Sequence, residues 1–224
     1  MREIVLDTET TGLDPSDGHR IVELGCIELV NHMPTGRVFH RHINPERDMP
    51  EEAYAVHGLS AEFLAKFPPF AEHVEAFLEF VGDGRLIIHN AEFDLKFINS
   101  ELRRLGKAPL RCDVEDTLAL ARRRFPGAQA SLDALCRRFA IDLTARTKHG
   151  ALLDCELLAA VYLELIGGRQ PGLDFVEDGV LADGVPTVAR PLRPARPHAA
   201  SVEELAAHAA MLQLLKQPIW LAEA

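Results

Sequence analysis

The chain has 224 residues, 47% of them apolar and 26% charged, and a formal net charge of −10 at pH 7. This is the composition of a globular protein, which excludes disorder throughout, and the length allows one full domain plus an appendage. The negative charge excludes a protein that coats nucleic acid through a generally basic surface. Because there is neither a run of 18 apolar residues nor a signal-peptide pattern, the sequence indicates a cytoplasmic protein.

The chain begins with an apolar strand that ends in two acids. We expect a strand over residues 2–7, and its apolar residues 4–6 make it a core strand. Residues two apart on a strand point to the same face, so Asp7 and Glu9 should direct both carboxylates to one spot. Such pairs are usually solvated, but on a buried strand they are costly unless a cation compensates them.

The next elements alternate between strands and helices. Two further strands, at 20–30 and 37–43, are separated by a turn over 32–36 and should form an antiparallel hairpin. Short strands are expected at 86–89 and 110–114, and apolar periods predict helices at 69–81 and 92–105. Further helices are expected at 117–124, 132–139 and 150–166. This order indicates an α/β fold, a mixed five-stranded sheet flanked by helices.

Four cysteines are distributed along these elements. They are separated by 86, 24 and 19 residues, which matches neither a zinc motif nor a dense disulfide framework. We therefore expect small, buried, apolar side chains at Cys26, Cys112, Cys136 and Cys155.

Two later segments combine a histidine with an acid. The run 89–94 follows a short strand and opens a helix, where the helix dipole alone favours an acid such as Asp94 in the first turn. The run 149–154 ends in Asp154 among leucines. Five helical residues turn by about 140°, so we place His149 on the loop before the helix and Asp154 on its inward face. A carboxylate without compensation would be costly there.

These four acids would repel one another if the fold brought them together. The repulsion is about 4 kcal/mol per close pair at an effective dielectric constant of about 20. Two divalent cations would remove it, and oxygen ligands suit Mg²⁺ or Mn²⁺ rather than Zn²⁺. Two such ions about 4 Å apart clamp the attacking and leaving oxygens of a phosphodiester displacement. A neutral histidine nearby could accept the proton of the attacking water.

Taken together, these segments resemble the three exonuclease motifs of the DEDDh family, which has a ribonuclease H-like fold. The motifs are Asp-Thr-Glu-Thr-Thr-Gly-Leu at 7–13, His-Asn-Ala-Glu-Phe-Asp at 89–94, and His149 with Asp154. The match extends over residues 2–166. The ordered set of three motifs is far more specific than any one of them.

The resemblance assigns roles to individual residues. It implies four metal ligands, Asp7, Glu9, Asp94 and Asp154, and it implies that His149 is the general base. Residues 55–59, Ala-Val-His-Gly-Leu, look like the family's Val-His-Gly segment. This implies that His57 and Glu52 contact the 3′-terminal nucleotide, beside Asp7, Glu9 and Asp154. Spacing alone would make His57 a loop histidine.

The end of the chain differs in composition from the domain. Residues 167–200 contain five glycines and five prolines among 34 residues, which is typical of a flexible linker. Ser201 can then cap a helix with Glu203 and Glu204 in its first turn. Apolar residues recur at three- and four-residue steps as far as Trp220. We expect an exonuclease domain over 1–166, a linker over 167–200 and an amphipathic segment over 201–224.

Within the family, this end resembles that of the proofreading subunits of bacterial DNA polymerase III. The run 203–208 and Ile219-Trp220 look like their polymerase-binding end, which implies that 201–224 binds the catalytic alpha subunit. Residues 170–175, Gln-Pro-Gly-Leu-Asp-Phe, look like a sliding-clamp peptide. The function implied is that of a metal-dependent 3′→5′ exonuclease which releases nucleotides from DNA 3′ ends.

Several alternatives remain open at this point. The enzyme could trim RNA instead of DNA, or the chain could be a non-catalytic adaptor between polymerase and clamp. The terminal segment could fold back on its own domain. Arginine runs at 103–104, 122–124 and 137–138 could line a path for DNA or be solvated helix faces. The domain has 19 basic and 27 acidic residues, so its own hold on DNA should be weak.

Overall fold

The structure is a computed structural model that describes residues 1–144, 148–168 and 199–214. The chain divides into two compact units, Met1–Gly172 and Leu173–Ala224. The boundary falls inside the segment predicted to be a linker. The clamp-like peptide at 170–175 and the terminal Ile219-Trp220 lie outside the described residues. No helix in the described residues is both long and apolar enough to cross a membrane.

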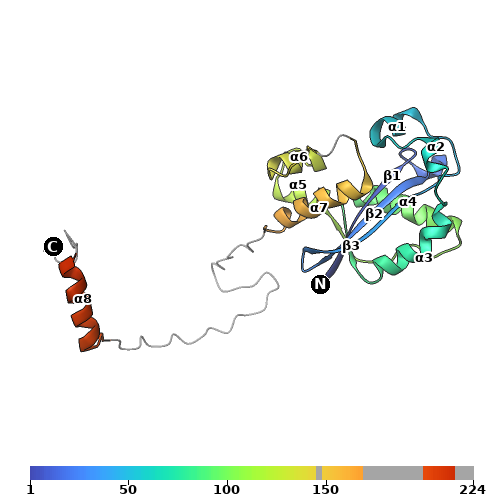
Figure 1. Cartoon of the computed structure of the whole chain (residues 1–224). Helices are drawn as coiled ribbons and strands as arrows, with labels where there is room; N and C mark the ends of the chain where they lie inside the picture. Colours follow the sequence, from blue (N-terminus) through green and yellow to red (C-terminus); the bar gives the residue numbers. More distant parts are fainter. Residues whose placement is uncertain (145–147, 169–198, 215–224) are drawn as a thin grey trace. The chain divides into compact units, whose positions relative to one another are not determined.

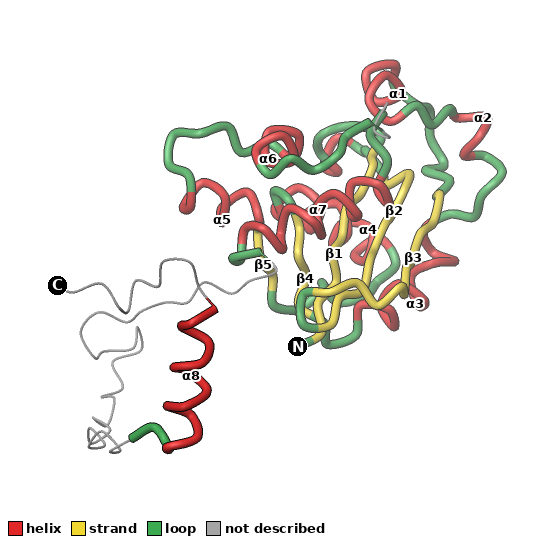
Figure 2. Tube along the Cα trace, turned by 60° about the vertical axis from the view of Figure 1, so that its left-hand side comes forward, coloured by secondary structure: helices red, strands yellow, loops and turns green. Residues whose placement is uncertain are grey.

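The first unit is built on a five-stranded mixed sheet with the order β3-β2-β1-β4-β5 (Figures 1 and 2). Its strands are β1 (Arg2–Thr10), β2 (Ile21–Val30), β3 (Met33–His42), β4 (Arg85–Ile88) and β5 (Val114–Asp116). The pairs β1–β2 and β2–β3 are antiparallel, whereas β1–β4 and β4–β5 are parallel. The predicted fold class, an α/β fold with a mixed five-stranded sheet, is confirmed.

Helices cover both faces of this sheet. In chain order the described helical elements are the short 3₁₀ helix η1 (Pro15–Asp17), α1 (Glu51–His57), α2 (Ala61–Leu64), α3 (Phe70–Val81), α4 (Ala91–Arg104), α5 (Thr117–Arg124), α6 (Leu132–Arg138) and α7 (Ala151–Leu165). Helices α3 and α4 enclose one apolar core against the sheet. Helices α5, α6 and α7 enclose a second core on the opposite face. Side chains alternate between the faces of a strand, so the central strand β1 contributes to both cores.

The β2–β3 hairpin differs from the prediction in the place of its turn. Val30 and Met33 are register partners, so the loop has only two residues, Asn31 and His32. Both have positive φ, 50° and 66°, as the tight hairpin turn requires. The predicted turn over 32–36 is wrong because Pro and Gly are tolerated on an edge strand, and β3 is at the sheet edge.

Two other differences concern short elements. The last strand runs over Val114–Asp116 rather than 110–114. Leu110 instead donates its backbone N–H to the Asn99 side chain, 2.8 Å away, so this part of the chain bonds to α4 and not to a strand. The helices α1 and α2 were not predicted, because segments of seven and four residues are too short for a clear apolar period.

Three of the four cysteines are buried as expected, and Cys112 is not. Cys26, Cys136 and Cys155 are buried, Cys112 is partly buried, and none of the four forms a disulfide. Burial raises the thiol pKa of Cys26 and Cys155, and nearby Asp7 raises both further. These thiols therefore stay protonated and act as small core side chains.

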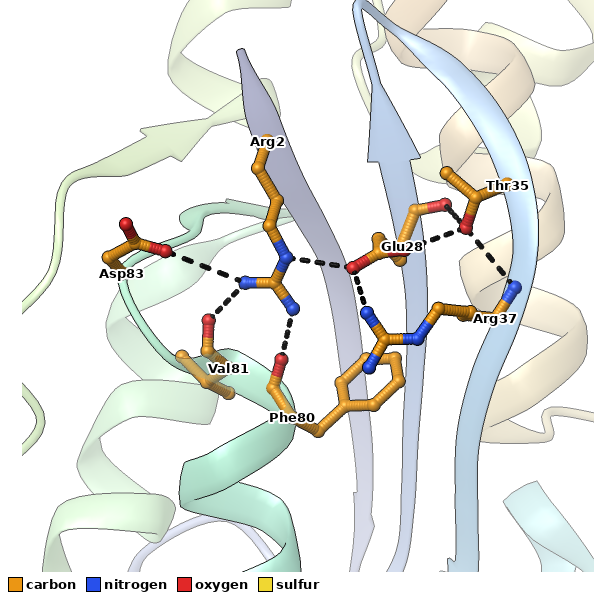
Figure 3. Close-up of polar contacts among 7 residues, drawn as sticks. All are labelled: Arg2, Glu28, Thr35, Arg37, Phe80, Val81 and Asp83. Atoms are coloured by element: carbon orange, nitrogen blue, oxygen red, sulfur yellow. Dashed lines mark hydrogen bonds and ion pairs between the residues drawn. The ribbon is translucent and has the colours of Figure 1, made fainter.

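A partly buried ion network ties the first strand to its neighbours (Figure 3). Arg2 donates to Glu28 over 2.7 Å and to the carbonyls of Phe80 and Val81, at the C-terminal end of α3. Glu28 also accepts a hydrogen bond from Arg37 over 2.7 Å. Arg2 thus neutralises a buried carboxylate and satisfies two helix-end carbonyls at once.

Arg2→Ala is expected to reduce the free energy of unfolding by about 2–3 kcal/mol, because it leaves Glu28 and the α3 carbonyls poorly compensated. Arg37→Ala removes a mostly exposed partner of the same carboxylate, and should cost about 1 kcal/mol or less. Urea unfolding of both variants in the full chain measures the difference. Equal losses would show that Arg2 has no special role in this network.

The second unit contains one described helix, α8 (Val202–Leu214). The Ser201 hydroxyl accepts from the Glu204 N–H over 3.2 Å, and the Glu204 carboxylate accepts from the Ser201 N–H over 2.8 Å. This reciprocal pair is a capping box, and it confirms Ser201 as the N-cap. Val202, Leu205 and Leu214 are exposed.

Candidate active site

The acids of the first motif lie on β1, at the end where α4 also begins. Strands β1 and β4 are parallel, and Val5 pairs with Ile87, so both strands run towards the same edge of the sheet. Asp7 and Glu9 lie on β1 beyond the residues that pair with β4. In α/β folds a ligand usually binds outside the carboxyl ends of the strands, where neighbouring strand connections run in opposite directions.

Asp94 reaches the same place from the first turn of α4. It is only 3% exposed. Its carboxylate accepts hydrogen bonds from the backbone N–H of Thr8 over 3.0 Å and from the Thr8 hydroxyl over 2.7 Å. Thr8 lies between the two acids of β1, so these bonds fix Asp94 against the strand. The helix dipole alone favours an acid in the first turn, but it does not require the carboxylate to be buried.

Asp154 is brought in by a close approach between α7 and β2. Gly25 is the register partner of Asp7, and a Cβ on Gly25 would lie 2.6 Å from the carbonyl carbon of Ala151. Only glycine therefore lets the first residue of α7 rest on the strand backbone. One turn later Asp154 points inward and is 3% exposed, as predicted.

His149 lies on the loop before α7, as predicted, and its side chain is about 50% exposed. Its Nδ1 is 3.3 Å from Oδ2 of Asp154. Its backbone N–H donates to the carbonyl of Val56 over 3.3 Å, which joins the loop to α1. One ligand atom from each of Glu9, His149 and Asp154 lies within 4.8 Å of the others.

The electrostatics of this cluster call for positive charge. Burial raises the pKa of Asp7 well above its usual range, and the charges of Asp94, Glu9 and Asp154 raise it further. Burial also raises the pKa of Asp94 to about 7, against the effect of its bonds from Thr8. A cation bound here would stabilise the ionised form of these carboxylates. A buried set of mainly oxygen donors fits a hard divalent metal.

A pocket of about 510 Å³ adjoins the acid cluster, between the end of β1 and helix α1. Glu9 lines it from the strand, Glu52 and His57 line it from α1, and Leu13 and Phe93 add apolar walls. A pocket with acids at one side and apolar walls at the other suits a nucleotide.

His57 is not a loop residue, contrary to its spacing in the sequence. It is the last residue of α1, it is 6% exposed, and its Nδ1 accepts the backbone N–H of Leu59 over 3.0 Å. Burial lowers the pKa of its imidazole. Helix α1 ends there because Gly58 follows with φ of 74°.

The fold thus brings all the predicted site residues to one region. Five of them form the cluster, Asp7, Glu9, Asp94, His149 and Asp154. Glu52 and His57 face the adjoining pocket. Sequence reasoning missed Thr8 as the support of Asp94, and it missed Gly25. A glycine inside an otherwise apolar strand was the available signal for a close backbone approach.

Several arginines from the basic runs have partners within the fold. Arg123 lies 3.6 Å from Glu115, Arg124 donates to the carbonyl of Leu165, and Arg138 stacks over Phe125 at 4.5 Å. These contacts support helices α5 to α7. A path for DNA along these residues stays a prediction.

Comparisons with known proteins agree with this geometry. The family model described as Exonuclease (RNase_T) matches residues 4–162. DNA polymerase III subunit epsilon of Rickettsia felis is 54% identical over 191 residues, covering 84% of this chain and 83% of that protein. The Escherichia coli K12 subunit of the same name is 44% identical over 229 residues, covering 96% and 94%.

Solved structures share the fold at lower identity. Exonuclease X in complex with 5′ overhanging duplex DNA has a TM-score of 0.59 and 23% identity, covering 73% of this chain and 90% of that one. The nuclease domain of 3′hExo, described as a DEDDh family member bound to rAMP, has a TM-score of 0.64 and 16% identity. It covers 74% of this chain and 91% of that one.

Proposed function

Since the chain belongs to the exonuclease family, and within it to the DNA polymerase III epsilon subunits, we propose that its acid cluster removes 3′-terminal nucleotides from DNA. The observation that carries this proposal is the convergence of four acids and His149 beside a pocket of nucleotide size. A replication subunit works on the chromosome, so we expect it in the cytoplasm.

We assign Asp7, Glu9, Asp94 and Asp154 to two Mg²⁺ or Mn²⁺ ions. Burial raises the pKa of both Asp7 and Asp94, and repulsion from the neighbouring acids raises that of Asp7 further. These shifts support the assignment, because cation binding would stabilise both carboxylates in their ionised form. When bound, the two ions would supply Lewis-acid stabilisation of the attacking and leaving oxygens of the phosphodiester. The predominance of oxygen donors favours Mg²⁺ or Mn²⁺ over softer metals.

The remaining residues position the reactants. His149 is half exposed on its loop, so its imidazole can accept a proton from a water that approaches the terminal phosphodiester. The contact with Asp154 holds the ring beside the acids. Glu52 and His57 face the pocket next to the cluster, where the 3′-terminal nucleotide would lie.

A hydrolysis assay tests this proposal against its two rivals. The full chain is incubated with Mg²⁺ and labelled DNA or RNA of the same sequence, each with a mismatched 3′ end. We expect release of nucleoside monophosphates from the DNA 3′ end, and slower release from RNA. Faster RNA cleavage would support the RNA-trimming alternative, and no cleavage of either would support the adaptor.

We also propose that the chain is divided as its composition suggests, with the exonuclease domain over 1–166, the linker over 167–200 and the polymerase-binding segment over 201–224. The exposed Leu205 on α8 supports docking on another protein. A helix of this length is marginal by itself in water. A tether would raise the concentration of the nuclease near the primer end, which offsets the acidic domain's weak hold on DNA. Residues 170–175 are our candidate for clamp binding.

Ending the chain after Gly168 should leave hydrolysis of single-stranded DNA within about twofold, because the site residues all precede this point. It should eliminate co-purification with the catalytic subunit of the polymerase. Within the full chain, Leu205→Asp should weaken that association by about tenfold or more, and Glu203→Gln on the same helix is the matched control. Undiminished binding by the shortened chain would refute the tethering role.

A further inference from the structure

A second cluster of metal-binding side chains lies on β2 and β3, beside the acid cluster. His40 and His42 are two apart on β3 and therefore share one face of the strand. Glu23 on β2 is the register partner of His42, and it belongs to the same group of potential ligands. The backbone of the hairpin thus presents two imidazoles and one carboxylate together.

The donor atoms are already close to the spacing that a metal needs. Glu23 Oε1 is 2.7 Å from Nε2 of His40 and 3.8 Å from Nε2 of His42. The ligand atoms of a tetrahedral Zn²⁺ site lie about 3.3 Å apart, given bond lengths of about 2.0–2.2 Å. The two Glu23–histidine distances are on either side of this value, and one ligand atom from each of the three residues lies within 4.8 Å of the others.

The surroundings also resemble those of a metal site. The second oxygen of Glu23 accepts the N–H of Ala151 over 3.2 Å, which fixes the carboxylate from behind. Phe63 and Phe67 pack against the ring of His42, with centroids 5.1 and 5.0 Å away. Both imidazoles remain partly exposed, so water can complete the coordination.

We propose that Glu23, His40 and His42 form a second divalent-metal site, which takes Zn²⁺ or a similar nitrogen-preferring ion. Two imidazoles and a carboxylate are a common ligand set for Zn²⁺ with one open position. Mg²⁺ prefers oxygen ligands and keeps most of its water, so this site discriminates against the metal proposed for the acid cluster.

The carboxylate of Glu23 connects the proposed metal site to the active site. Glu23 holds the first residue of α7, two residues after His149 and three before Asp154. A metal on Glu23 would restrain the end of α7 that supports both. This inference is independent of the nuclease assignment, because it concerns a different set of ligands.

Titration of the metal-stripped full chain with Co²⁺, in the presence of excess Mg²⁺, tests the site. Bound Co²⁺ gives visible absorption bands that report nitrogen ligation and low coordination number. We expect His40→Ala and His42→Ala to lose one equivalent of bound Co²⁺ and its bands. His73→Ala removes a partly buried histidine from α3 and should retain both. Circular dichroism in EDTA confirms that each variant is folded.

Calorimetry with Zn²⁺ supplies a second measurement. Glu23→Gln keeps an acceptor for Ala151 but loses the charge. Loss of an outer-sphere partner typically lowers metal affinity by roughly 10–100-fold, so loss of the charged ligand itself should lower the Zn²⁺ affinity by at least that factor. The proposal would be overturned if His40→Ala and His42→Ala both bound as much Co²⁺ as His73→Ala and gave the same absorption bands.

Discussion

Asp7→Asn is expected to reduce Mg²⁺-dependent hydrolysis by at least about 10³-fold, because it removes a charged ligand at the centre of the acid cluster. Asp7 is the group whose pKa the other three acids raise, so its charge interacts with all of them. Glu92→Gln is the matched control, since Glu92 is an exposed acid in the same helical turn as Asp94. Release of labelled nucleotide from single-stranded DNA measures both.

The same substitution should not destabilise the metal-free protein. Removing one of several mutually repelling buried carboxylates relieves repulsion, so the free energy of unfolding in EDTA should be unchanged or higher. Loss of activity together with loss of folding would leave no evidence for a ligand role. Activity at the parent's level in Asp7→Asn would show that the two-metal assignment is wrong.

The pH dependence of stability in EDTA follows from Asp94. Its pKa rises from 3.8 to about 7 on folding, mainly because the carboxyl is buried. The folded protein therefore binds this proton more tightly, and the resulting stabilisation is complete below about pH 4 and lost as the pH rises through about 7. Asp94→Asn keeps an acceptor for the Thr8 bonds but cannot ionise. Urea unfolding at pH 5 and pH 8 should show a smaller difference for this variant.

His149→Ala is expected to lower the hydrolysis rate by about 10²–10⁴-fold, the usual contribution of a general base. Binding of DNA and of metal should persist, because the four carboxylates remain. A general base accepts a proton only in its neutral form, so the pH–rate profile of the parent protein should differ in shape from that of His149→Ala.

Lys148 provides the control for this variant. It is the exposed neighbour of His149 in the chain, and its ammonium lies 4.9 Å from the centroid of the Tyr54 ring. Lys148→Ala should retain the pH–rate profile even if DNA binding weakens. A profile in His149→Ala that equals the parent's would show that another group takes the proton.

The local pattern of the sequence was sufficient for most of the regular elements. The apolar period of 3.6 residues in α3 and α4 and the apolar run before Asp7 are properties of short segments, so they could be read without the fold. The three motifs likewise identified the acids and His149, because their order and spacing are specific. Ser201 was recognisable as a cap because capping depends on four consecutive residues.

Contacts between distant segments were decided only by the tertiary structure. Ala151 and Gly25 are 126 residues apart in the sequence, and their close approach places Asp154 beside Asp7. The bonds from Thr8 fix Asp94 in the same way. The two-residue turn at Asn31 and His32 sets the register of β2 and β3, and this register places Glu23 opposite His42. A shift of one residue would turn each side chain to the other face. Such pairings depend on packing between elements, which no local period encodes.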